Sequence, residues 1–319
     1  MKTIALKIKE SRWTARLLSP VILVLLIVVF SVMTGGRFSN MRNLSIVLQQ
    51  ALIVGTVATG AVFIFATGNV NISMGAATAL IATIAANAFL ATNSLFVMFA
   101  AAVVAGVIVL MLTALLSTAL NVRVLFVTVV MMTLLASIQK AMLGSSTLKI
   151  PYEVTSALND ANVPLIVFLV FFVFCTVLFH FTALGRKLRY IGINEQCAEL
   201  TGFKQSRYLL VAFAVAGIGV GLGAVMTIVR SGTITTDTCA TLNMDCMLAI
   251  VLGGMSCFGG SRSNTYSGIV GALIVTVLNN GLLMVGVSST VIQAIRGVVF
   301  IILVCASQKR PQGLPSRDG

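Results

Sequence analysis

The sequence predicts an all-α polytopic membrane protein of about ten transmembrane helices, with broken or re-entrant segments and both termini in the cytoplasm. Of its 319 residues, 58% are hydrophobic and only 9% are charged, whereas a soluble domain carries about 25% charged residues. The mean hydropathy is +1.07. A helix needs about 20 apolar residues to cross a bilayer, so the chain is long enough for ten crossings. These values exclude a soluble enzyme, a disordered chain and a disulfide-rich secreted module.

A basic segment precedes the first predicted span. Residues 1–16 contain five Lys and Arg residues, and an apolar run follows over residues 17–33. A secretory signal peptide begins in a similar way, but the sequence Thr-Gly-Gly-Arg at 34–37 lacks the small-residue cleavage pattern. We therefore expect a cytoplasmic N-terminus at 1–16, a single transmembrane domain at 17–308 and a cytoplasmic tail at 309–319.

Glycine and asparagine divide the long uncharged stretch that follows. No charged residue occurs from Asn43 to Val122, a stretch of 80 residues that is too long for a single crossing. The best break is Thr67–Gly75, with the sequence TGNVNISMG. The spans expected around this break cover residues 44–66, 75–91, 94–120 and 124–143.

The second half of the chain predicts five further spans around one long polar segment. Residues 144–162 are polar and predict a loop, and residues 185–207 form the longest polar segment after the N-terminus. Paired glycines at 253–254 and 259–260 interrupt the end of one short span. The spans expected here cover residues 163–184, 208–229, 245–255, 266–285 and 288–307.

The distribution of the formal charge of +13 indicates how the chain is oriented in the membrane. With the N-terminus inside and ten spans, 15 of the 21 Lys and Arg residues fall on the cytoplasmic side, as the retention of positive charge on that side requires. The opposite orientation would place the two most basic segments outside. The charge is therefore no sign of a nucleic-acid partner, and we expect none.

No catalytic constellation appears in the sequence. The chain has one histidine, His180, and six cysteines without a C-x-x-C pair, so we expect neither a metal site nor a cofactor. A phosphate-binding loop of the G-x-x-x-x-G-K-[ST] type is missing. Every acid falls in a loop or at the end of a span, including Asp245, which argues against a proton- or sodium-coupled carrier. These features favour a non-enzymatic pore or permease whose energy comes from elsewhere.

Uncharged polar side chains mark the interior of the predicted spans. Asparagines beside glycine-rich breaks are the clearest, because backbone leaves the helix at membrane depth only where protein or water surrounds it. Amides and hydroxyls offer donors and acceptors to a neutral polyhydroxylated solute without the cost of burying a charge. The alternative is that these groups join helices by hydrogen bonds. The residues expected to line the path are Asn69, Asn71, Ser73, Asn279 and Asn280.

The polar segment 185–207 predicts a docking element. Residues 194–201 have helix-forming character, with Asn194 as the N-cap, Glu195 in the first turn and Gly202 as the C-terminal stop. A short amphipathic helix between two spans, on the cytoplasmic face, is suited to contact another protein. The alternative is an ordinary solvated loop.

At this segment the sequence resembles the ribose-type (simple-sugar) permeases of bacterial ABC importers. The match is to the cytoplasmic coupling segment of that family, and the residues that carry it are Gly185, Arg186, Ile191, Gly192, Asn194, Ala198 and Gly202. Three further stretches resemble other motifs of the family, so that the resemblance covers nearly the whole chain. They are residues 67–76, 249–263 and 268–286.

The resemblance implies a machine with other subunits in the bacterial inner membrane. Cytoplasmic ATP-binding subunits would hydrolyse ATP, a periplasmic sugar-binding protein would deliver the solute, and a second permease chain, identical or related, would complete the path through the lipid. In this reading the segment 192–202 docks on the ATP-binding subunits. The residues expected to make this contact are Gly192, Asn194, Glu195, Ala198, Glu199 and Gly202.

Some positions depart from the family pattern. Asn69 stands where the family usually has Gly, Asn71 replaces the usual Asp, and Ser263 replaces a Gly. These differences bear on the choice of substrate. Permeases for branched-chain amino acids or nucleosides are similar in outline and remain an alternative, although a zwitterion calls for charged or helix-terminus contacts in the path. A self-sufficient secondary carrier or channel is a further alternative.

Overall fold

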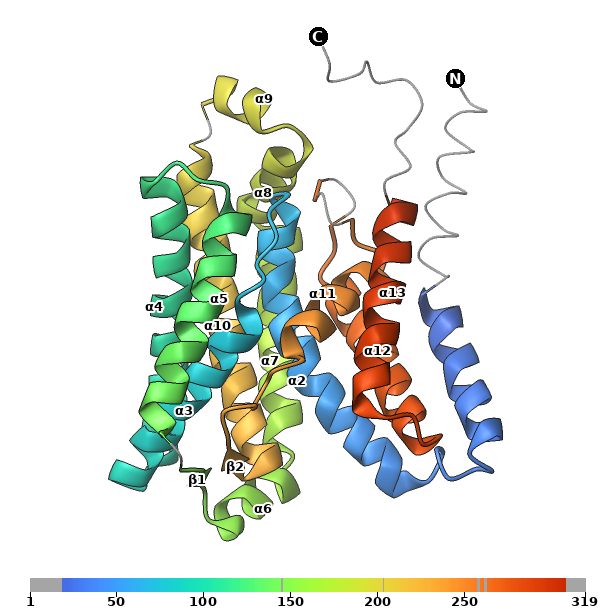
Figure 1. Cartoon of the computed structure of the whole chain (residues 1–319). Helices are drawn as coiled ribbons and strands as arrows, with labels where there is room; N and C mark the ends of the chain where they lie inside the picture. The colour runs from blue at the N-terminus through green and yellow to red at the C-terminus, as the bar shows by residue number, and fades with distance from the viewer. Residues whose placement is uncertain (1–18, 145, 203, 257–258, 261–262, 308–319) are drawn as a thin grey trace, which may run out of the picture.

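The structure is a bundle of apolar helices. In this computed structural model the described residues are 19–144, 146–202, 204–256, 259–260 and 263–307, with the side chains of Glu195, Leu303, Ala306 and Ser307 left aside. The predicted terminal segments 1–16 and 309–319 lie outside the described residues. Figure 1 shows α8 (Ala183–Ile193) and α9 (Glu195–Leu200) at one end of the bundle and α6 (Tyr152–Asp160) at the other.

The described elements follow one another as helices, with two short strands. The described chain begins with a helix over Ser19–Met33. The first half continues with α2 (Met41–Ala66), α3 (Met74–Thr92), α4 (Leu95–Ala119), α5 (Val124–Leu143), β1 (Leu148–Lys149) and α6. The second half contains α7 (Val163–Thr176), the π-helical turn η1 (Val177–Phe181), α8, α9, α10 (Gln205–Ser231), β2 (Thr233–Ile234), α11 (Leu242–Leu252), α12 (Tyr266–Met284) and α13 (Ser289–Ser307).

Seven of these helices are long and apolar enough to cross a membrane, by length and composition alone: α2, α3, α4, α5, α7 continued through η1, α10 and α12. Three shorter apolar helices lie where the remaining three spans are predicted: Ser19–Met33, α11 and Ser289–Ile302 of α13. With 11 residues, α11 is about 16 Å long, roughly half the thickness of a hydrocarbon core. The all-α class is thus confirmed, and the count of ten crossings stays a prediction.

The segment predicted to be a loop contains a helix, and the predicted docking element begins with a helix that was not expected. Residues 152–160 form α6, with Glu153 in its first turn, where a negative charge complements the helix dipole. Residues 183–193 form α8, which begins after an extended residue, Thr182, whose hydroxyl accepts a hydrogen bond from the Leu184 N–H at 3.2 Å. The break predicted at Thr67–Gly75 is confirmed, because the chain is non-helical between α2 and α3.

Helix α10 lies in the core of the bundle, where it packs against α2, α3 and α4. Glycines at every second position from 217 to 223 allow this close approach. A Cβ atom on Gly221 would lie 2.5 Å from the Ala102 carbonyl oxygen of α4, and one on Gly219 would lie 3.0 Å from the Thr56 carbonyl oxygen of α2. Helices in membranes associate through such small residues, since lipid tails are as apolar as leucine.

A two-stranded antiparallel pair closes the bundle at the α6 end. Leu148 pairs with Ile234 and Lys149 with Thr233, and the Ile150 N–H donates to the Gly232 carbonyl at 2.9 Å. These bonds tie the connection between α5 and α6 to the end of α10.

The outer faces of the bundle are apolar. On α4, Val104, Ile108 and Leu112 are each about half exposed, and their spacing of four residues places them on one face of the helix. An exposed apolar stripe of this length is suited to contact with lipid chains.

Replacing Gly221 with alanine tests the packing of α10. In a helix, Gly→Ala is favourable by about 1 kcal/mol from propensity alone. At Gly221, however, the new methyl would overlap the backbone of α4, and overpacking costs about 1–3 kcal/mol. We expect Gly221→Ala to lower the apparent unfolding temperature of the purified protein in detergent.

Gly297→Ala on α13 is the matched control, because a Cβ atom there would meet no atom of the structure within 4 Å. This variant is expected to be neutral or slightly stabilising. Equal melting temperatures for the two variants would contradict the packing role of Gly221.

Candidate functional site

The α8–α9 segment forms an exposed, amphipathic surface at one end of the bundle (Figure 1). Gly185, Leu188 and Ile191 are buried on one side of α8. Tyr190 and Ile193 are 65% and 61% exposed. Large apolar groups that face outward in a charged segment are typical of a contact surface.

Helix α9 has the caps that its sequence predicts. The Asn194 side chain accepts a hydrogen bond from the Cys197 N–H at 3.2 Å. Gly202 has φ +84°, and its N–H donates to the Glu199 carbonyl at 2.9 Å. The predicted short helix is therefore confirmed, with Ala198 buried and Leu200 88% exposed. The Glu195 side chain lies outside the described residues.

Gly192 anchors this surface to the membrane helices. A Cβ atom at Gly192 would overlap the Ala66 carbonyl oxygen at the end of α2 and lie 2.8 Å from the backbone nitrogen of Gly260. The Gly260 N–H in turn donates to the same Ala66 carbonyl at 3.3 Å. Backbone from three distant parts of the sequence thus meets at one point, where only a glycine fits.

The interrupted segment between α2 and α3 carries three of the predicted path residues. The Asn69 Nδ2 donates to the Thr67 hydroxyl at 3.0 Å. Asn71 is completely buried, and its Oδ1 accepts bonds from the Ser73 N–H and the Ser73 hydroxyl, both at 2.8 Å. The Asn71 Nδ2 is a buried donor without a hydrogen-bond partner among the described residues. An aspartate there would accept the same two bonds but could not supply this donor.

Helices α3 and α11 begin at the same place inside the bundle. A Cβ atom on Gly75 would lie 3.0 Å from both the Asn243 nitrogen and the Cys239 carbonyl oxygen. Asn243 is only 7% exposed, and its Oδ1 has no partner in the described part of the chain. The N-terminal ends of two helices carry partial positive charge. The junction therefore combines two positive helix ends with an unused amide donor and an unused amide oxygen.

Sequence reasoning did not include Asn243. The signal that was available is the polar run from Thr235 to Asn243, which precedes a short apolar helix just as residues 67–73 precede α3.

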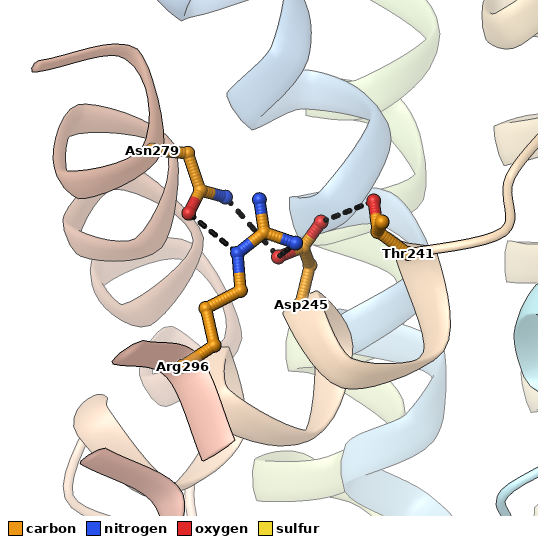
Figure 2. A network of polar contacts seen from close by, with 4 residues as sticks. All are labelled: Thr241, Asp245, Asn279 and Arg296. Carbon is orange, nitrogen blue, oxygen red and sulfur yellow. Dashed lines mark hydrogen bonds and ion pairs between the residues drawn. The ribbon is translucent and has the colours of Figure 1, made fainter. Parts of the chain in front are cut away.

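Asn279 lies in a charged network that joins three helices (Figure 2). Its Nδ2 donates to Asp245 Oδ1 at 3.1 Å, and its Oδ1 accepts from Arg296 Nε at 2.7 Å. Arg296 Nη1 lies 3.1 Å from Asp245 Oδ1 in an ion pair whose side chains are only 11% and 10% exposed. The Thr241 hydroxyl donates to Asp245 Oδ2 at 3.3 Å. Both ends of the Asn279 amide are thus occupied.

This network adds to what the sequence predicts. Asp245 stands in the first turn of α11, as expected, and it is also buried. A buried charge pair is also present, although none was evident from the sequence. Asp245 and Arg296 are 51 positions apart, and only the packing of α11 against α13 brings them together.

Asn280 lies beside Asn279 but leaves the helix about 100° around its axis. It is 8% exposed, and its Oδ1 has no partner within the described residues. Within that same part of the chain, no hydrogen bond joins Asn279 or Asn280 to Asn69, Asn71 or Ser73. The predicted path residues therefore form two separate groups.

His180 lies at the π-helical turn η1, and its Nε2 is 3.3 Å from the Thr265 hydroxyl. Among the residues that the structure describes, no group of three His, Cys, Asp or Glu side chains could hold a metal ion.

Comparison with known proteins gives relatives over nearly the full length. The ribose import permease protein RbsC of Escherichia coli K12 is 26% identical over 307 residues, which cover 93% of this chain and 95% of the relative. RbsC of Bacillus subtilis is 34% identical over 46% of each chain. The autoinducer 2 import system permease LsrD of Salmonella paratyphi B is 34% identical over 44% of this chain and 42% of its own length. No solved structure matches.

The sequence pattern of one permease family matches residues 43–304, from α2 to α13. The resemblance to ribose-type permeases seen in the sequence is confirmed by these relatives. The chain belongs to the family described as "Branched-chain amino acid transport system / permease component".

Proposed function

We propose that this chain is the transmembrane permease subunit of an ATP-driven ABC importer for a simple sugar or a similar neutral polyhydroxylated solute. The observation that carries the proposal is the backbone contact at Gly192, where the exposed α8–α9 segment lies directly against the interrupted segments of the membrane bundle. The near full-length similarity to a ribose import permease supports it.

The α8–α9 segment is the docking surface for cytoplasmic ATP-binding subunits. Its exposed apolar side chains lie among charged ones, with Arg186 and Glu199 also exposed. Gly192, Asn194, Glu195, Ala198, Glu199 and Gly202 shape it: the asparagine and Gly202 define the ends of α9, and Gly192 holds it against Ala66. In this arrangement ATP is hydrolysed on the partner, and movement of the docked surface displaces the end of α2.

The path for the solute follows the interrupted segments. Asn69, Asn71 and Ser73 line or support it before α3, and Asn279 and Asn280 do so on α12. Asn243 belongs with them, because it lies against Gly75 with an unused oxygen. Neutral amides match the hydroxyl groups of a sugar, since each group both donates and accepts.

The remaining assignments follow from this function. The protein is a multi-pass protein of the bacterial inner membrane, with α8, α9 and both termini on the cytoplasmic side, where most of its basic residues are expected. The α6 end then faces the periplasm and the sugar-binding protein. A second permease chain, identical or related, completes the path.

A branched-chain amino acid is the second candidate substrate. The buried pair of Asp245 and Arg296 supplies opposite charges of the kind that a zwitterion requires, and the family description names such transporters. In the structure, however, the two charges bind each other and Asn279.

Reconstitution decides between these functions. The permease, its ATP-binding subunits and the binding protein are placed in proteoliposomes, and uptake of radiolabelled ribose and leucine is measured. We expect ATP-dependent uptake of the sugar. Uptake that required a proton gradient and ignored ATP would refute the proposal, and uptake of leucine alone would favour the second substrate.

Reversing charge on α9 tests the docking surface. We expect the double variant Glu195→Lys/Glu199→Lys to reduce co-purification with the ATP-binding subunits and ATP-dependent uptake at least about tenfold, which corresponds to 1.4 kcal/mol. The matched control is Glu153→Lys/Asp160→Lys on α6, at the opposite end of the bundle. An equal loss of co-purification in both variants would contradict the assignment of α9 as a docking surface.

Truncating Asn71 tests the path. Asn71→Ala leaves the Ser73 N–H and hydroxyl buried without their acceptor, at a cost of about 1–3 kcal/mol. We expect a lower unfolding temperature and at least about tenfold slower uptake. Asn87→Ala on α3, the helix that follows Asn71, should have little effect, because Asn87 is only partly buried. Wild-type uptake by Asn71→Ala would exclude the path role of Asn71.

A further inference from the structure

The buried pair of Asp245 and Arg296 is the strongest polar link between the short helix α11 and the last helix, α13 (Figure 2). Asn279 of α12 bonds to both charged side chains, so that one residue from each of three helices takes part. The inference drawn from it rests on the function proposed above.

Stability alone does not account for this pair. Removing two charges from water costs more than their attraction regains in many proteins, and apolar residues of similar volume are often as stable or more stable. In a membrane the cost is higher, and ionisable groups within spans commonly mark functional positions. Here the rest of α13 between Ser289 and Ile302 carries no charge, which makes Arg296 exceptional within its own helix.

Helix α13 has few other points of attachment. Between Ser289 and Ile302, Ile292 is the one residue that is fully buried, at 2% exposed. Arg296 follows it by one turn on the same face. Much of the helix is exposed, including Val291 and Val298. Val299 and Phe300, which are partly buried, add apolar contacts with the core. Arg296 is thus the charged member of a small set of contacts that hold α13 against the bundle.

The chain that follows α11 leads to the docking region. Gly253 follows the helix, and a Cβ atom there would overlap the Ser267 carbonyl of α12. The chain then reaches Gly260, which bonds to the Ala66 carbonyl beside Gly192. Helix α11 is thus a rigid rod of about 16 Å, with the docking region near one end and Asp245 in its first turn at the other.

We propose that Asp245 and Arg296 are positioning residues that make α13 move together with α11. When the ATP-binding subunits displace the α8–α9 segment, α11 shifts with the backbone at Gly260, and the ion pair carries α13 with it. The movement of the cytoplasmic surface thereby reaches the half of the membrane nearer to α6, where the path must open and close.

The first test measures uptake per ATP hydrolysed in proteoliposomes that contain the whole importer. Asp245→Asn keeps the size of the side chain, Arg296→Gln shortens it but keeps a polar amide, and each removes the ion pair. We expect each to lower the ratio of solute taken up to ATP hydrolysed at least about tenfold. The reason is that ATP hydrolysis continues while α13 no longer moves together with α11. Thr276→Val is the control, since that buried hydroxyl bonds only to carbonyls of its own helix.

An apolar pair separates positioning from packing. Asp245→Leu/Arg296→Met fills the same space without charge or directed bonds. We expect it to restore thermal stability in detergent but not the uptake ratio. Full recovery of the ratio would show that any packed contact suffices and would overturn the proposal.

The second test follows the two helices directly. Spin labels at Met244 and Val291, each 49% exposed, report the distance between α11 and α13 in a chain whose six cysteines are replaced and whose uptake has been verified. In the wild-type network we expect an unchanged distance between the nucleotide-free and the ATP-trapped importer. In Asp245→Asn we expect the distance to change between the two states.

The outcomes are distinct. A distance that changes equally in both backgrounds, or an uptake ratio that stays at the wild-type value in both single variants, would overturn the positioning role and leave the proposed importer function intact. Uptake that needs no ATP in the unmodified protein would overturn both.

Discussion

Backbone polar groups need partners wherever water is absent, and this requirement shapes the whole bundle. Each unpaired N–H or C=O in an apolar setting costs several kcal/mol. The chain nevertheless interrupts its helices twice in the interior, before α3 and before α11. Both interruptions are covered by protein: Asn71 binds the turn at Ser73, and Gly75 lies against Asn243 and Cys239. The long helices around them exclude lipid from these segments, so that their backbone polar groups can find partners within the protein.

Close packing at glycine residues makes the surrounding helices rigid relative to one another. The glycines of α10 bring α2 and α4 to backbone contact, and Gly192 does the same for the docking segment. When one helix moves, a contact between two backbones moves the neighbouring helix with it, because no long, flexible side chain lies between them. The ion pair of Asp245 and Arg296 adds a directed polar link between α11 and α13 to a bundle that is held mainly by close packing.

Much of this organisation was accessible from the sequence because it is encoded locally. Hydropathy predicted the seven long helices. The TGNVNISMG segment predicted the break between α2 and α3, and Asn194 and Gly202 predicted the two ends of α9. Helices α6 and α8 were missed because their polar faces hide them from a hydropathy criterion. The ion pair and the place of Asn243 were inaccessible for another reason: they depend on which faces of distant helices meet, and Asp245 and Arg296 show their relation only when α11 and α13 are packed.

The contact at Gly192 has a thermodynamic consequence for the partner. The α8–α9 segment and the end of α2 share one backbone junction. In the proposed importer this junction would link the docking surface to the path, and coupling between binding sites is reciprocal. If binding of the ATP-binding subunits shifts the interrupted segment toward one arrangement, occupancy of that segment must alter the affinity of those subunits by the same factor. In the proposed importer, the ATP-binding subunits would therefore bind a solute-loaded permease and an empty permease with different affinities.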